Sequence, residues 1–227
     1  MNARHSLLEE LRREYEAAHV TVRGDAIEGF ESIDARMHRA FRWLEQAITY
    51  LNGIKPAIRH RFDLGYGYAF ESPRFSHGSV SQQQRRIRGY PVLEEVAVYY
   101  DIAASQPLTI EVVPGWVAFA EKTLDAFGLQ YDCQRVEGEN GGMHKCVFTV
   151  PPVIPAKVSF RASYETGLVT VALFNVDRLD RVSLEFESSA IDNTVLEDLV
   201  RLMLGRDANF LRRAPLSGLR PAAQLAA

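Results

Sequence analysis

The stretch KVSFRASYETGLVTVALFNVDRLDRVSLEF, residues 157–186, decides the fold class of this chain. It holds three candidate strands, at 157–164, 168–176 and 181–186, separated by the short turn sequences ETG and DRLD. Strands joined by such short turns pair antiparallel, because a parallel pair needs a crossover of a dozen or more residues. The stretch therefore predicts an antiparallel meander.

The strand pattern extends upstream from this meander. A period of two begins after Pro56 and predicts further strands at 58–64, 66–75, 92–103, 108–113, 129–136 and 144–150. Two helical patterns interrupt them, one opened by Pro114 and closed by Gly128, the other capped by Asp192 or Asn193 and closed by Gly205. The sequence thus predicts an α+β fold: a mostly antiparallel sheet built from hairpins, with two covering helices.

An N-terminal helical segment precedes this sheet. A capping box at Ser6 and Glu9 opens a short helix over 6–18, and a longer amphipathic helix is predicted over 27–51, ended by Asn52 and Gly53. We therefore expect a helical segment at 1–55, an α+β domain at 56–212 and a flexible tail at 213–227.

Composition limits the class of protein. The 227 residues are 47% hydrophobic with a net charge of -3, which is typical of a globular protein and excludes wholesale disorder. No apolar run approaches the roughly 20 residues needed to span a bilayer, and the charged N-terminus is unlike a signal peptide. We expect a cytoplasmic protein without membrane contact.

No catalytic motif is present in the sequence. The phosphate-binding GxxxxGK[ST], the dinucleotide-binding GxGxxG, HExxH and GxSxG are all missing, and the six histidines are scattered. We therefore predict no catalytic residues, no metal and no cofactor. An enzyme or small-molecule binder with a non-local site stays open, and convergence of Tyr68, Glu71, His60 and His77 in one pocket would favour it.

The midpoint of the two cysteines, Cys133 and Cys146, falls between Glu139 and Asn140, within the hairpin turn expected at 138–141. Equal distance from a turn predicts near-opposite neighbours on paired strands. We expect free core thiols, because two cysteines are too few for a disulfide-based scaffold.

One segment is distinctly basic. Residues 55–90 hold seven arginines and lysines against two acidic residues, and 79–88 reads as a polar, mobile loop flanked by aromatic residues. Such a segment can bind an acidic protein surface or single-stranded nucleic acid, and it can equally be a solvated loop. The candidate residues are Arg74, Arg85, Arg86, Arg88 and Tyr90.

These observations favour a non-catalytic macromolecular-interaction protein, acting as a subunit, adaptor or regulator of a cytoplasmic complex. The partner is a protein or a second copy of the chain, and a nucleic-acid-associated role through 55–90 is the alternative. The helices at 6–18 and 27–51 are the expected docking surface, although the longer helix can equally pack on its own sheet. The candidate protein-binding residues are Phe30, Met37, Phe41, Leu44 and Ile48.

Overall fold

A computed structural model describes the backbone of the chain except at residues 1–6, 66, 139–142, 207–208, 215 and 221–227, and most side chains outside 7–28, 30–31, 143 and 216–220. The α-helices are α1 (Leu7–Ile54), α2 (Val117–Ala126) and α3 (Asn193–Met203). The strands are β1 (Phe62–Gly65), β2 (Tyr68–Phe70), β3 (Arg74–Ile87), β4 (Tyr90–Ala103), β5 (Leu108–Val112), β6 (Asp132–Glu137), β7 (Met143–Val150), β8 (Val153–Ser163), β9 (Leu168–Phe174), β10 (Arg181–Glu187) and β11 (Leu216–Arg220).

The main sheet has six antiparallel strands in the order β11-β10-β9-β8-β4-β3. Its β8-β9-β10 portion is the meander predicted from residues 157–186. Two smaller antiparallel sheets, β5-β7-β6 and β1-β2, flank it. The predicted α+β class with a mostly antiparallel sheet is confirmed.

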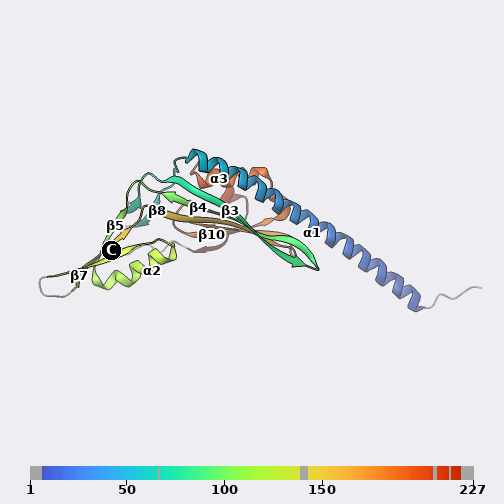
Figure 1. The fold of residues 1–227 in the computed structure, drawn as a ribbon. Helices are drawn as coiled ribbons and strands as arrows, with labels where there is room; N and C mark the ends of the chain where they lie inside the picture. The colour runs from blue at the N-terminus through green and yellow to red at the C-terminus, as the bar shows by residue number, and fades with distance from the viewer. Residues whose placement is uncertain (1–6, 66, 139–142, 207–208, 215, 221–227) are drawn as a thin grey trace, which may run out of the picture.

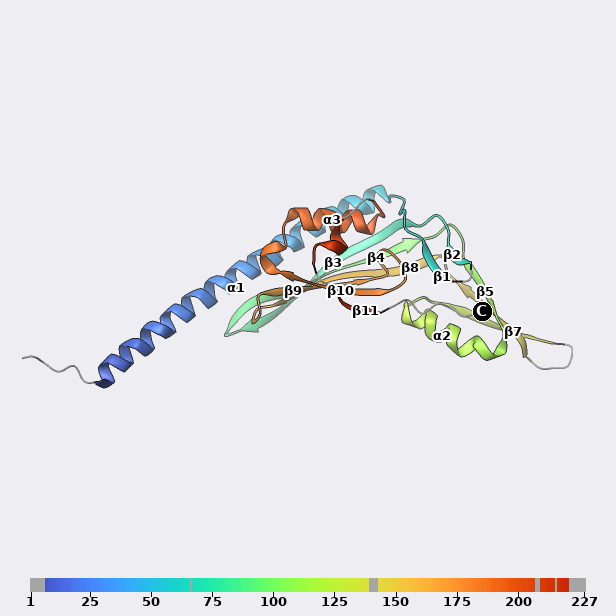
Figure 2. The ribbon, with the colours of Figure 1, turned by 180° about the vertical axis from the view of Figure 1, so that it is seen from behind.

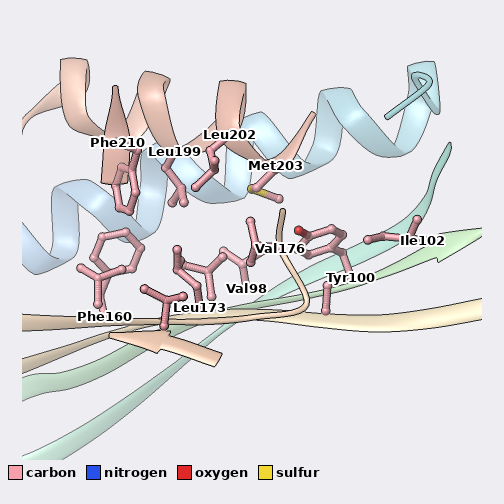
Figure 3. Close-up of a cluster of buried hydrophobic side chains, with 14 of the residues drawn as sticks. Val98, Tyr100, Ile102, Phe160, Leu173, Val176, Leu199, Leu202, Met203 and Phe210 are labelled. Atoms are coloured by element: carbon pink, nitrogen blue, oxygen red, sulfur yellow. The ribbon is translucent and has the colours of Figure 1, made fainter. Parts of the chain in front are cut away.

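Helices α1 and α3 cover one face of the main sheet (Figures 1 and 2). The strands direct Val98, Phe160 and Leu173 into this layer, and α3 contributes Leu199 and Leu202 from above (Figure 3). These side chains are buried, and burial of each full-sized apolar side chain stabilises the fold by about 1.5–3 kcal/mol. The opposite face of the sheet carries the alternate residues of each strand.

Helix α2 does not cover the main sheet in the expected way. It packs against the β5-β7-β6 sheet, which is inserted between β4 and β8, through the buried Ala120 and Leu124. Asn175 joins this insertion to the main sheet: its side-chain Nδ2 donates to the carbonyl oxygens of Phe127 and Pro155, at 2.9 and 2.8 Å. The second covering helix is therefore α1.

The N-terminal region forms one helix of 48 residues rather than the two predicted helices. Gly24 does not interrupt it, since a helical glycine costs only about 1 kcal/mol relative to alanine. A helix of this length spans about 72 Å, and its N-terminal part extends past the sheet (Figures 1 and 2). It ends before Lys55, whose φ of 47° lies in the left-handed region, followed by Pro56.

Two other expectations need correction. Part of the region expected to be a flexible tail forms β11, which pairs with β10 through main-chain bonds that require no apolar pattern. Cys133 lies opposite Phe148 and not opposite Cys146, because the register is offset by two residues from the one that the turn predicted. As expected, neither cysteine is in a disulfide, but only Cys146 is buried.

Candidate protein-binding surface

The predicted docking stripe on the long helix lies inside the molecule. Met37, Leu44 and Ile48 are buried in the core beneath α1, and Phe41 is half-buried against the same core. These residues cannot reach a partner without leaving the chain's own sheet, so the alternative of packing on that sheet is correct for them. The side chain of Phe30 lies outside the described residues.

The five basic and aromatic candidates do not form one site. Arg74 begins β3 and donates from Nη2 to the carbonyl of Lys55 at 3.2 Å. Arg85 follows eleven residues later on the same strand, a separation of about 36 Å at 3.3 Å per residue. The structure therefore gathers Arg85, Arg86, Arg88 and Tyr90 and leaves Arg74 at the other end.

The gathered residues form the tip of the β3–β4 hairpin. Arg88 and Gly89 make a two-residue turn with φ of 51° and 89°, the positive values that a type I′ turn requires. The side chains of Arg86, Arg88 and Tyr90 are exposed, Tyr90 to 73%. Arg85 is half-buried, and its Nε lies 3.7 Å from a carboxylate oxygen of Glu94.

The polar run that was predicted as a mobile loop is part of a strand. Residues 79–87 continue β3 without a break, each paired with β4. Serine and glutamine fit an edge strand because its stability comes from main-chain bonds to its neighbour rather than from burial of both faces. β3 is the last strand of the sheet, so no strand formed by the described residues lies along one of its two sides.

The start of this edge is nevertheless protected. Ala57 forms an isolated bridge with Arg74, and the Asn52 side chain binds both main-chain groups of Gly78: its Nδ2 donates to the carbonyl at 2.9 Å and its Oδ1 accepts the N–H at 2.8 Å. Asn52 thus takes the place of a neighbouring strand at Gly78.

The contact between Asn52 and Gly78 also shows which main-chain groups point away from β4 farther along β3. Main-chain direction alternates in an antiparallel strand, and the register to β4 is regular from His77 to Gln83. Since Gly78 points its N–H and C=O away from β4, Val80 and Gln82 do so too. No hydrogen bond from a described residue reaches these outward groups, and Ser81 to Gln84 are all exposed. We call residues 79–84 the open edge.

The uncovered face of the sheet differs from this edge because its charges are already paired. Glu95 is buried there between Arg161 at 2.9 Å and Lys157 at 3.4 Å. Burial alone would raise the pKa of Glu95, but the hydrogen bond from Arg161 and the two positive charges outweigh it and lower the pKa. Lys157 also lies over the Tyr99 ring, 5.0 Å from its centroid. These cations are not available as a ready anion site.

Ionisable groups in the structure serve to hold elements together. Asp34 of α1 accepts the Leu93 N–H at 2.7 Å and lies 3.5 Å from His38, and the Tyr164 hydroxyl lies between Asp34 and the Leu93 carbonyl. Burial and the negative charge of Asp34 raise the pKa of Tyr164. This cluster fastens α1 to β4 next to the tip of the β3–β4 hairpin.

The residues whose convergence would favour an enzyme are engaged separately. The His60 ring nitrogen bonds to the carbonyl of Leu202 at the end of α3, Glu71 accepts from Gln106, and His77 is exposed on β3. Within the described residues, no hydrogen bond or ion pair joins these groups to one another.

A shallow cavity of about 350 Å³ lies between α1 and the start of α3. Two of its polar groups have structural partners: Arg36 donates to the carbonyl of Ser188, and Asp192 caps α3 by accepting the Val195 N–H. In the described part of the chain, no three His, Cys, Asp or Glu side chains are arranged to hold a metal ion. None of the described helices is long and apolar enough to cross a membrane.

Comparison of the chain with protein-family models, with curated proteins and with solved structures gives no match. The open edge and the hairpin tip next to it are therefore identified by geometry alone. Sequence reasoning found the tip from its charge but missed the edge. The signal that could have found it is the length of the run from Arg74 to Ile87 opposite the apolar β4.

Proposed function

We propose that this protein is a non-catalytic protein-binding subunit or adaptor that accepts an extended segment of its partner at the open edge of β3. The observation that carries the proposal is the open edge itself, an uncharged run that is exposed except at the half-buried Val80, with outward main-chain groups at Val80 and Gln82. In this mode of recognition the partner adds a strand to the sheet and satisfies those groups.

The contrast along β3 supports this role. Soluble proteins protect sheet edges with charges, bulges or covering segments, because an unprotected edge pairs with other chains. β3 has such protection toward both ends. Asn52 and Ala57 cover its start, and the charged Arg85 and Arg86 lie near its C-terminal end. The six residues between them carry no charge, and no hydrogen bond from a described residue reaches the outward groups of Val80 and Gln82, although the register with β4 shifts between Gln83 and Gln84.

The energetic gain from such pairing is moderate. Outward groups at two residues offer four main-chain hydrogen bonds, and each contributes about 0.5–1.5 kcal/mol net. Bonds of this number give about 2–6 kcal/mol before the cost of association, so side chains of the partner must add to the affinity. The interaction suits a regulated or transient complex.

The nucleic-acid alternative is less well supported by the geometry. The basic candidates divide between the two ends of β3, and the cations of the uncovered face are paired with Glu95. A strand that tracks phosphates needs a continuous basic groove.

Proline at Gln82 tests the proposal. The Gln82 N–H points away from β4, so Gln82→Pro removes an outward donor and leaves the bonds between β3 and β4 in place. Gln82→Ala is the matched control, because it removes the same side chain and keeps the N–H. Native lysate is applied to the immobilised full chain and both variants, with and without nuclease, and bound proteins are quantified by mass spectrometry.

We expect partners that survive nuclease, remain with Gln82→Ala and fall at least tenfold with Gln82→Pro. Circular dichroism and urea unfolding verify that both variants fold. The double variant Ser81→Lys, Gln83→Lys gives an independent check, since edge lysines oppose strand pairing and both side chains are exposed. Partners retained equally by all variants, or lost on nuclease treatment, would overturn the proposal.

A further inference from the structure

We infer that the partner segment pairs antiparallel to β3 and carries acidic residues at its N-terminal end, where they meet the arginines of the hairpin tip. The inference rests on the proposed function and specifies its partner. It is based on the order of residues along β3, where the uncharged open edge at 79–84 is followed directly by Arg85, Arg86 and Arg88.

Orientation follows from the direction of β3. The strand runs from Arg74 toward the tip at Arg88, so the arginines lie at its C-terminal end. In an antiparallel pair the N-terminal end of one strand lies beside the C-terminal end of the other, and antiparallel pairing is the slightly more stable of the two arrangements. A segment docked on the open edge therefore presents its N-terminal end to the arginines.

The charge of the tip is incompletely balanced. Residues 79–94 contain three arginines and one glutamate, a net charge of +2 in a chain whose total is -3. Glu94 lies 3.7 Å from the Arg85 Nε, which is buried and has no hydrogen-bond partner, and Arg86, the next residue along β3, is exposed. A carboxylate arriving at this end would pair with the exposed Arg86.

The backbone of the tip supports a role for its side chains. Arg88 has a φ of 51°, a region where a type I′ turn prefers asparagine or glycine. A non-glycine residue of this type costs about 1–2 kcal/mol in that region. The fold keeps an arginine at this exposed position despite the cost, which fits a functional role for its side chain.

Tyr90 adds an apolar contact at the same place. It pairs with Ile87 across the turn, and its ring is 73% exposed. Exposed tyrosines and arginines are the residue types that most often dominate binding energy at interfaces. The tip thus offers a charged and an aromatic contact beyond the main-chain bonds of the open edge.

Two synthetic peptides test the inference. The first is acetyl-Asp-Glu-Asp-Thr-Val-Thr-Val-Thr-Val-Thr-amide, and the second has the reverse order of residues, so that composition and charge are the same. Binding to the full chain is measured by fluorescence anisotropy of labelled peptides, at low and at 0.5 M salt. We expect the first peptide to bind at least tenfold more tightly at low salt, with a smaller difference at high salt.

Charge reversal identifies the contact. Arg86→Glu should weaken binding of the first peptide at least tenfold, and a peptide with lysines in place of its three acidic residues should recover affinity for this variant. Arg59→Glu is the matched control, since Arg59 is also exposed and the change in net charge is the same. Its effect on binding should stay below twofold.

The outcomes separate the inference from the proposed function. Equal binding of the two peptides, both abolished by Gln82→Pro, would overturn the acidic-end inference and leave strand addition intact. Tighter binding of the second peptide would overturn the antiparallel orientation. Binding unaffected by Gln82→Pro, or no binding of either peptide at millimolar concentration, would overturn both.

Discussion

Replacing Asp34 by alanine should loosen β4 next to the tip of the β3–β4 hairpin. The Asp34 carboxylate accepts the main-chain N–H of Leu93, at 2.7 Å, where β4 departs from its regular register with β3. Leu93 is fully buried, so its N–H has no access to water once the carboxylate is removed. The variant therefore leaves a buried donor unsatisfied in the strand that supports the open edge.

The magnitude follows from the two effects of the substitution. A buried N–H that loses its acceptor costs about 1–3 kcal/mol. Alanine is a better helix former than aspartate, which returns about 0.5 kcal/mol within α1. The free energy of unfolding should therefore fall by about 0.5–2.5 kcal/mol. The Tyr164 hydroxyl, 2.8 Å from the Leu93 carbonyl, keeps that bond in the variant.

Urea unfolding measures the global change, and amide hydrogen exchange measures the local one. Glu45→Ala is the control for helix propensity, because Glu45 is an exposed acidic residue of the same helix. Exchange at the Leu93 amide should accelerate in Asp34→Ala and stay unchanged in Glu45→Ala. A stability within 0.5 kcal/mol of wild type, or continued full protection of the Leu93 amide, would refute the role assigned to Asp34.

Three further outcomes are expected. Arg88→Asn should raise the free energy of unfolding in urea by about 0.5–1 kcal/mol, because asparagine suits a positive φ, and should weaken binding of the peptide with the acidic N-terminus. The pKa of Glu95 is lowered in the folded protein. The carboxylate therefore stabilises the fold fully above its ordinary pKa of 4.5, and this stabilisation is lost as the pH falls through the lower pKa of the folded state. Glu95→Gln should accordingly reduce the loss of thermal stability between pH 5 and about pH 3. Gly205→Ala should cost at least about 2 kcal/mol in urea unfolding, since φ is 65° and a Cβ would lie 2.7 Å from the His60 main-chain nitrogen.

The meander could be predicted because its signals are local. The turns at 165–167 and 177–180 lie between apolar runs, and the structure places β8, β9 and β10 on those runs with a regular register. Helix α3 was equally accessible: Asp192 caps it and Gly205, with φ of 65°, follows its end. In each case the residues that decide the element lie within or beside it.

The elements that sequence reasoning missed depend on distant partners. Residues 79–87 are polar, and they form a strand because the apolar β4 pairs with them along its whole length. β11 forms in the same way on β10. The apolar stripe of α1 was correctly identified, but a stripe does not say what covers it, and here Met37 and Leu44 pack on the chain's own sheet.

The open edge shows most clearly why composition could not locate this site. Its position depends on which residues of β3 direct their main-chain groups away from β4. Asn52 bonds to the outward groups of Gly78, 26 residues away, and strand alternation then turns those of Val80 and Gln82 outward. A shift of one residue would direct the same groups into the ladder with β4 and leave Ser81 outward instead. Gln82→Pro and Gln82→Ala both remove the glutamine side chain, but only Gln82→Pro removes the main-chain donor. Comparing them therefore shows whether the outward N–H of Gln82 takes part in binding. In the proposed recognition at β3, register therefore decides which strands can pair, and the charges of Arg86 and Arg88 select among them.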